Sequence, residues 1–449
     1  MRINRILPFL LLLFLFCSCK EEQNPVSVKD EQGTLTSNEQ LLISELNKYI
    51  TPCKTTLPDA DKSDLKVFDI FANAKVLGLG EATHGTKEFF RMKHRIFKYF
   101  VENHQFKIFG FEADMGECLY IDRFICNDIG TIDEAMKKMH FWTWRTQEVK
   151  ELILWMKQFN EGKSDADKIH LLGVDCQLKT YNKDLIQNYL QKHSGGYPNY
   201  IQSIIEDVDK ITNEEIESLN LIQFEKLKAR CDSVTSFFDE NSNHLISSSG
   251  KFEFELIKRL TIQTKQFLDV VISINYGYRD KYMAENTIWL TELLGNNTKV
   301  VSWAHNGHVG VNDVYLNNGS QGYFLRSFLG NNYKVIGFSF NYGTFRAINY
   351  DYANKKYTGL MIHENNTLPP RESSNFIFNY ANPQDFILLI ENSNNSTVLS
   401  NWLNAQRKIF DIGAVYTNAL YNDYFRLINL KASYDALIHF HSTTAAVPY

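Results

Sequence analysis

The stretch KVLGLGEATHGTKEFFRMKHRIFKYFVENHQFKIFGFEAD, residues 75–114, decides the fold. It contains two short apolar runs, Lys75–Leu79 and Lys107–Phe111, that have the length and composition of buried strands. Between them, residues 86–103 repeat large apolar side chains every three or four positions, which predicts an amphipathic helix. A strand, a helix and a second strand in this order form a right-handed crossover, so we expect the two strands to be parallel.

Outside this stretch, apolar runs predict five more strands and hence an α/β fold, a mostly parallel central sheet flanked by helices. The runs are Ile169–Val174, Lys299–Trp303, Lys334–Phe340, Asp385–Ile390 and Ala436–Phe440. Between about residues 180 and 286, amphipathic segments rich in Glu and Lys replace the strand signal. We interpret this part of the chain as a helical insertion into the α/β domain.

The composition excludes several classes of protein. With 449 residues, of which 44% are hydrophobic and 14% aromatic, the chain can bury a large core. Its 47 Lys and Arg residues stand against 52 Asp and Glu, a net charge of −5 without a basic block, so we expect no nucleic acid partner. Seven cysteines without a C-x-x-C pair indicate neither a zinc ribbon nor a dense disulfide framework.

The amino-terminal residues resemble a bacterial export signal. Arg2 and Arg5 precede the apolar run Ile6–Phe16, which is too short for a membrane-spanning helix. The tetrapeptide at residues 16–19, FCSC, resembles a lipobox and predicts that Cys19 is cleaved at and acylated. A plain secretory signal with incidental cysteines is the alternative.

This interpretation divides the chain into three parts. We expect a signal peptide over residues 1–18, a lipid-attached Cys19 with a flexible polar linker over residues 19–38, and an α/β domain over residues 39–449. The lipid would anchor the protein in the bacterial outer membrane, on the periplasmic or the cell-surface side.

Standard motifs of three enzyme classes are missing from the sequence. It contains no G-x-S-x-G elbow, no G-x-x-x-x-G-K-[ST] loop and no H-E-x-x-H, so a serine α/β-hydrolase, a P-loop NTPase and a zincin lose support. Residues 78–83, GLGEAT, superficially resemble a dinucleotide fingerprint. Thr83 in place of the third glycine, and Glu81 where a pyrophosphate must approach, argue against a nucleotide site.

Ionisable side chains follow four of the predicted strands. They are Glu81 and His84 after the first, Glu112 and Asp114 at the end of the second, Asp175 at the end of the third, and His305 and His308 after the fourth. Since the carboxyl ends of parallel strands form one edge where ligands bind, these residues can share one site. There an imidazole can take a proton from water while a carboxylate holds its tautomer and a second imidazole or a cation stabilises the oxyanion. This chemistry is hydrolysis.

Each candidate also has a structural interpretation. His84 could cap the helix that starts near Thr86, and Glu112 could be a buried ion-pair partner of Arg91 or Arg95. Asp175 is expected to cap or hydrogen-bond a loop. Alternatively, His305 and His308 could bind a metal ion together with Glu81 or Glu112. Four other histidines are expected to be core or solvated residues, namely His94, His104, His140 and His170.

Together, these motifs resemble the erythromycin esterase family. The resemblance rests on VLGLGEATHGTKEFFRMKHRIFKYFVENHQFKIFGFEAD followed by WMKQFN, LLGVD, RDKYMAEN and VVSWAHNGHVG, and it runs from about Lys75 to His441. It implies an α/β core in which the helical insertion forms one wall of a deep cleft. It also implies that activated water, without an acyl-enzyme serine, opens the macrolactone ester of 14-membered macrolides.

The resemblance assigns roles by motif position. It makes His84 the general base, with Glu81 in the same turn, and lets Glu112 support the base and the water. His305 becomes the second catalytic imidazole, with His308 beside it.

Three further positions of the resemblance imply substrate binding. They are Glu88 at the helix start, Arg279 of RDKYMAEN and Lys93. Lys93 stands where some macrolide esterases carry an arginine. It keeps the positive charge of arginine but lacks the bidentate fork.

Three functions follow as hypotheses. The first is a metal-independent hydrolase, without a cofactor, that cleaves a small-molecule ester or lactone, with a macrolide lactone as the best single substrate. The second is a hydrolase whose metal ion is held by His84, His305, His308 and a glutamate. The third is a surface lipoprotein that binds a glycan or lipid-like ligand without catalysis. No particular oligomeric state is predicted.

Overall fold

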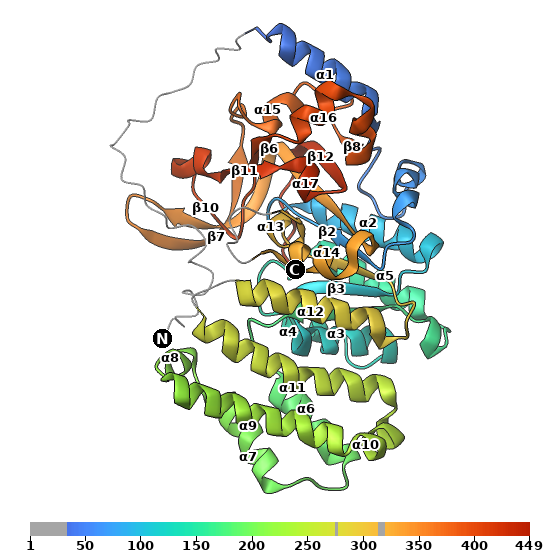
Figure 1. Cartoon of the computed structure of the whole chain (residues 1–449), viewed down its shortest axis with the longest axis vertical. Helices are drawn as coiled ribbons and strands as arrows, with labels where there is room; N and C mark the ends of the chain where they lie inside the picture. Colours follow the sequence, from blue (N-terminus) through green and yellow to red (C-terminus); the bar gives the residue numbers. More distant parts are fainter. Residues whose placement is uncertain (1–33, 274–276, 313–318) are drawn as a thin grey trace.

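The computed structural model describes residues 34–273, 277–312 and 319–449 (Figure 1). The expected signal peptide and Cys19 lie outside these ranges, so export and lipid attachment stay predictions. The first helix, α1 (Ser37–Tyr49), begins before the boundary predicted at residue 39, because Thr36 and Glu39 form a capping box. No helix within the described ranges is long and apolar enough to cross a membrane.

A mixed sheet forms the centre of the molecule, in the order β1-β8-β12-β6-β2-β5-β3-β4 (Figure 1). All seven predicted strands are present: β2 (Val76–Leu79), β3 (Ile108–Asp114), β4 (His170–Asp175), β5 (Val300–Trp303), β6 (Tyr333–Asp351), β8 (Phe386–Leu389) and β12 (Ala436–Thr443). From β12 to β4 every neighbouring pair is parallel. The structure therefore confirms the mostly parallel central sheet flanked by helices.

The remaining strands lie at the margin of this core. β1 (Ile50–Pro52) pairs antiparallel with β8, which is itself antiparallel to β12. β7 (Lys356–Asn365) forms an antiparallel hairpin with the far half of β6, which β10 (Val415–Tyr416) also joins. β9 (Gln406–Phe410) and β11 (Phe425–Asn429) form a separate two-stranded sheet.

Helices cover both faces of the sheet. Those before the expected insertion are α2 (Lys87–His104), α3 (Met115–Asn127), α4 (Ile132–Lys138) and α5 (Gln147–Asn160). Those after β5 are α13 (Asn306–Val309), α14 (Gln321–Leu329), α15 (Ser374–Phe378), α16 (Thr397–Leu403) and α17 (Leu430–Ser433). The helix predicted between the first two strands is α2.

The stretch interpreted as an insertion folds into a stack of helices. They are α6 (Asn182–His193), α7 (Asn199–Lys210), α8 (Asn213–Glu217), α9 (Leu221–Glu240), α10 (Ser242–Ser249), α11 (Lys251–Ile272) and α12 (Gly277–Leu293). In Figure 1 the first six gather at one end of the molecule, beyond α12. α12 packs on β3, β4 and β5 on one side and on α11 on the other. It thereby brings its first turn to the carboxyl end of the parallel strands.

The core has two layers because successive strand residues point to opposite faces of the sheet. On one face, Val76, Ile108 and Val300 join the apolar side chains of the helical stack. On the other face, Leu77, Phe109, Val301 and Trp303 pack against α2, α3 and α5. Each such fully buried aliphatic or aromatic side chain contributes about 1.5–3 kcal/mol to folding. Both layers hold the strand ends in fixed positions.

Candidate active site

The turn between β2 and α2 carries the first two candidate residues. Glu81 is fully buried, and its Oε1 lies 2.7 Å from Nδ1 of His84. A Cβ at Gly85 would come within 2.1 Å of the Arg346 carbonyl oxygen, so the turn needs glycine there. Because Glu81 accepts the Nδ1–H of the neutral ring, His84 carries its lone pair on Nε2. The His84 side chain is 16% exposed, which gives a bound molecule access to it.

Two buried donors on the far side of Glu81 keep this carboxylate charged. Its Oε2 accepts hydrogen bonds from Lys93 Nζ and, at 2.8 Å, from Trp303 Nε1. Burial alone would raise the pKa of Glu81, but Lys93 and His84 outweigh it and lower the pKa. Burial lowers the pKa of Lys93 to about 8. The carboxylate is thus an ionised anchor for His84.

Lys93 supports Glu81 instead of touching substrate, which corrects the expectation from the sequence. Its side chain has no exposed surface, and its Nζ lies 4.1 Å from the centre of the Trp303 ring. That indole is fixed by Phe90, Phe111 and Trp144, whose rings pack around it. A cation enclosed in this way stabilises the carboxylate and cannot contact a ligand.

Glu112, at the end of β3, is the centre of the second group. Its Oε2 accepts from the backbone N–H of His305 at 2.9 Å, and its Oε1 accepts from Arg279 Nη2 at 2.9 Å. Burial would raise the pKa of Glu112, but His308 and Arg279 outweigh it and lower the pKa.

The alternative interpretation, in which Glu112 pairs with Arg91 or Arg95, does not hold. Arg91 pairs with Glu151 and Arg95 pairs with Asp64. Both arginines lie on α2, whereas the cation that reaches Glu112 comes from α12.

Arg279 joins Glu112 to the end of β4. Its Nε and Nη2 donate to the two carboxylate oxygens of Asp175, at 3.0 and 2.8 Å. Asp175 also accepts from the backbone N–H of Cys176, the loop bond expected of it. Arg279 is 8% exposed, so its fork is used within the protein. Only this small exposed part of Arg279 is open to the substrate contact predicted from the sequence.

His305 lies beside His84, with 5.0 Å between the ring centres. Its Nε2 donates to the Ile412 carbonyl oxygen at 3.0 Å, and its Nδ1 accepts from the Gly307 N–H at 3.2 Å. Burial, together with the positive charge of His84 when protonated, moves the pKa of His305 well below its ordinary value. His305 is therefore a neutral imidazole, and 13% of its side chain is exposed.

The pKa of His308 is shifted in the opposite direction to that of His305. Its Nδ1 lies 2.8 Å from Asp280 Oδ1, and its Nε2 lies 3.3 Å from Glu112 Oε1. Burial would lower the pKa of His308, but the carboxylates of Asp280 and Glu112 outweigh burial and raise it. His308 therefore takes up a proton more readily than His305, and its Nε2 also lies 3.0 Å from Arg279 Nη1.

The structure thus gathers one set of residues at the carboxyl edge of the sheet, which we call the edge cluster. Its members are Glu81, His84, Glu112, Arg279, His305 and His308. Glu88 lies elsewhere: its carboxylate accepts from the backbone N–H and the hydroxyl of Thr444, both at 2.7 Å. It anchors the carboxyl-terminal segment, a correction to the predicted substrate contact.

Three participants were missed by the sequence reasoning. Asp280 directly follows Arg279 in the RDKYMAEN motif, and its carboxylate holds His308. Asp411, the residue after the unpredicted strand β9, has its Oδ1 3.3 Å from His305 Nε2. Trp303 was assigned only to a strand. For Lys93, its position four residues from both Phe89 and Phe97, on the apolar stripe of α2, was the available sign that it points inward.

The histidines of the edge cluster are each bound to a different partner instead of sharing one centre. Over the described ranges, the His, Cys, Asp and Glu side chains whose ligand atoms all lie within 4.8 Å of one another form one group of three, Asp122, Cys126 and His170. It includes no member of the edge cluster. The edge cluster therefore presents imidazoles that are each anchored by a separate partner, as a proton-transfer site requires.

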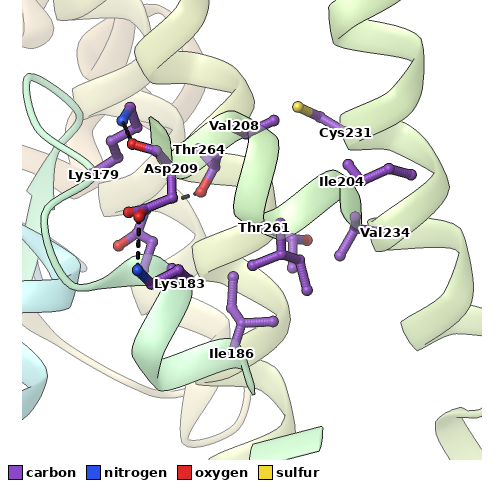
Figure 2. Close-up of a pocket in the computed structure, with 12 residues that line it drawn as sticks. Lys179, Lys183, Ile186, Ile204, Val208, Asp209, Cys231, Val234, Thr261 and Thr264 are labelled. Carbon is purple, nitrogen blue, oxygen red and sulfur yellow. Dashed lines mark hydrogen bonds and ion pairs between the residues drawn. The ribbon is translucent and has the colours of Figure 1, made fainter. Parts of the chain in front are cut away.

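A pocket separate from the edge cluster lies between α6, α7, α9 and α11 (Figure 2). Its wall is mostly apolar, with Ile186, Ile204, Val208 and Val234 among the lining residues. On its polar side, Lys183 Nζ bonds Asp209 Oδ2 at 2.7 Å. No member of the edge cluster lines it.

Comparison with known proteins extends these observations. The erythromycin esterase family model matches residues 101–443. Erythromycin esterase type II of Escherichia coli is 25% identical over 365 residues, which cover 73% of this chain and 83% of that protein.

Solved structures show the same fold. A crystal structure of a Bacillus cereus protein superposes with a TM-score of 0.80 at 25% identity, covering 92% of this chain and 100% of the other. A mutant of the erythromycin esterase EreC in its open conformation superposes with a TM-score of 0.64 at 14% identity, covering 89% and 98%.

Proposed function

The chain belongs to the erythromycin esterase family, and we propose that it is a hydrolase that cleaves an ester or lactone with water activated by His84, without a metal ion. The observation that carries the proposal is the 2.7 Å bond from His84 Nδ1 to Glu81 Oε1. That bond leaves the Nε2 lone pair for the proton of a water molecule. The buried Lys93 and Trp303 behind Glu81 keep its carboxylate charged and fixed.

The reaction then proceeds in two proton transfers. His84 Nε2 takes a proton from water while the water oxygen attacks the carbonyl carbon of the ester. The resulting imidazolium is stabilised by Glu81. When the carbon–oxygen bond breaks, His84 returns the proton to the leaving alkoxide. One ester and one water give one carboxylic acid and one alcohol, and His84 is regenerated.

His305 stabilises the charge that develops on the carbonyl oxygen. It is a neutral ring 5.0 Å from His84, and its Nε2–H now bonds the Ile412 carbonyl. In the proposed mechanism this N–H turns from Ile412 to the oxyanion, a donor of the kind that stabilises tetrahedral intermediates. Glu112 holds the His305 backbone in place, and Arg279 and His308 balance its charge.

We propose the macrolactone of a 14-membered macrolide as the first substrate to test. Support comes from the family and from the E. coli relative that bears the name erythromycin esterase type II. We further propose that the protein is an exported lipoprotein, acylated on Cys19 and anchored in the outer membrane, because of the charged and apolar pattern of residues 1–19. Labelling with a lipid precursor, lost in Cys19→Ala, tests the anchor.

Hydrolysis assays of the purified protein with a panel of substrates test the activity. A 14-membered macrolide, simple lactones and aryl esters are incubated with the protein, and mass spectrometry detects a product that has gained one water. We expect turnover whose rate is unchanged after dialysis against a chelator. Turnover that is lost with the chelator and restored by a divalent metal supports the metal-dependent hydrolase instead. Binding without any turnover supports the ligand-binding lipoprotein and overturns the proposal.

A further inference from the structure

A second cluster of ionisable side chains lies at the opposite end of β4 from the edge cluster. Asp122 and Cys126 are four residues apart on α3 and therefore share one helix face. That helix packs on β4, where His170 is the first residue. Asp175, which bonds Arg279 in the edge cluster, is the last residue of the same strand. Five residue steps of strand separate the two places by roughly 17 Å.

The three donor atoms are already spaced as the ligands of one tetrahedral metal ion. Cys126 Sγ lies 3.4 Å from His170 Nδ1 and 3.6 Å from Asp122 Oδ1, and His170 Nδ1 lies 3.2 Å from the same Asp122 Oδ1. Zinc bonds of about 2.3 Å to sulfur and about 2.0–2.2 Å to nitrogen and oxygen put tetrahedral sulfur–nitrogen and sulfur–oxygen pairs about 3.6 Å apart, and nitrogen–oxygen pairs about 3.4 Å apart. The three atoms thus form one face of a tetrahedron.

Neighbouring bonds hold the donors in this arrangement. The Leu171 N–H donates to Asp122 Oδ1 at 3.0 Å, and Asn160 Nδ2 lies 3.5 Å from Cys126 Sγ. The ring of Phe252 packs 4.7 Å from the ring of His170. Such outer contacts orient metal ligands and tune their affinity. Asp122 and His170 are 3% and 4% exposed, so their polar atoms face one another and not bulk water.

We propose that Asp122, Cys126 and His170 bind one zinc ion, with water in the fourth position. Thiolate, imidazole and carboxylate together form a donor set that suits zinc. The Cys126 thiol releases its proton when the metal–sulfur bond forms, so one proton leaves for each ion bound. The ion ties α3 to the beginning of β4, the strand whose last residue is Asp175. Its role is structural and independent of the reaction at the edge cluster.

Cobalt binding tests the site without any measurement of activity. The full chain is freed of metal with a chelator, dialysed and titrated with Co²⁺, whose bond to a thiolate produces a charge-transfer absorption band in the near ultraviolet. We expect the band to saturate at one equivalent and to disappear when Zn²⁺ is added. Cys126→Ser abolishes the band, whereas Cys231→Ser, a free cysteine on α9, keeps it.

Thermal unfolding gives a second readout. Zn²⁺ raises the Tm of the wild-type chain and of Cys231→Ser, but not that of Cys126→Ser, and Asp122→Asn, which removes a charged ligand, weakens zinc binding. Absence of the band, or a band that persists in Cys126→Ser, overturns the proposal. Cobalt uptake without a thiolate band, as expected of the edge-cluster histidines alone, also overturns it. None of these outcomes depends on whether the protein hydrolyses an ester.

Discussion

Replacing Glu81 with glutamine tests whether the tautomer of His84 drives catalysis. Glutamine keeps the shape of the side chain but turns one carboxylate oxygen into an NH₂ donor. In the wild type, Lys93 and Trp303 both donate to Glu81 Oε2, and His84 Nδ1 forms its hydrogen bond with Glu81 Oε1. The single amide oxygen therefore stays with Lys93 and Trp303, because an NH₂ group facing two donors would leave all of them unpaired. The NH₂ group then faces His84.

The size of the expected loss in kcat follows from the shift of the His84 proton from one ring nitrogen to the other. A ring nitrogen that accepts from an amide carries no proton, so the proton of His84 moves to Nε2 and the lone pair that takes a proton from water is lost. The equivalent change in the Ser-His-Asp triad, aspartate to asparagine, lowers kcat about 10⁴-fold. We expect a fall of about 10³–10⁴-fold in kcat for Glu81→Gln, which corresponds to about 4–5 kcal/mol in the barrier.

The assay is steady-state hydrolysis of the best substrate of the panel, with urea unfolding measured in parallel. Lys93 loses its anionic partner in this variant, so its pKa falls below the present value of about 8 and the unfolding free energy decreases. Rates are therefore compared only under conditions where both proteins are folded. Glu151→Gln is the matched control, since Glu151 is 46% exposed and pairs only at the surface with Arg91. It should keep full activity.

The reasoning is refuted if folded Glu81→Gln retains kcat within a factor of about three of the wild type. Nitrogen-15 NMR of the ring provides an independent check. It should show the proton of neutral His84 on Nδ1 in the wild type and on Nε2 in the variant.

Three further changes test buried ionisable groups, namely Lys93 and Arg279 beside the site and Glu117 on α3. Lys93→Met leaves Glu81 buried without its cation and should lower the unfolding free energy by about 3–5 kcal/mol in urea denaturation; unchanged stability would contradict the pairing. Burial raises the pKa of Glu117 from 4.5 to about 8, so the folded state binds the extra proton and stability falls as pH rises through this window. Glu117→Gln should remove that fall and raise the unfolding free energy by at most about 3 kcal/mol near neutral pH. An unfolding free energy that changes with pH in the same way in the variant and the wild type would argue against this role of Glu117. Arg279→Lys cannot form the two-point contact with Asp175 and should lower kcat/KM about 10²-fold, while wild-type kinetics would show that the fork is dispensable.

The parallel core was predictable because its strands are buried on both faces and therefore form continuous apolar runs. The residues of β2, β3, β4 and β5 are all buried. β7 has no such run, since most of its side chains are exposed and it is held by pairing with β6. A strand of that kind is specified by its partner, which lies outside any short window of sequence.

The contacts of the candidate site also divide into those that local sequence spacing predicts and those that depend on the tertiary fold. Glu81 and His84 lie three residues apart in one turn, so their contact could be expected from local spacing. The bonds of Glu112 to Arg279 and of His305 to Ile412 join residues more than a hundred positions apart. Whether a charged residue meets a substrate or another charge depends on such tertiary contacts, which is why the sequence offered Arg91 and Arg95 as alternative partners of Glu112 and did not indicate Arg279.

The central claim is that His84 itself removes the proton from water. It is tested most directly by the rate of hydrolysis by His84→Ala, measured with and without added imidazole on a variant whose fold and Tm match the wild type. We predict a loss of at least about 10³-fold and a partial recovery that rises with imidazole concentration. Turnover of His84→Ala at the wild-type rate would contradict the account.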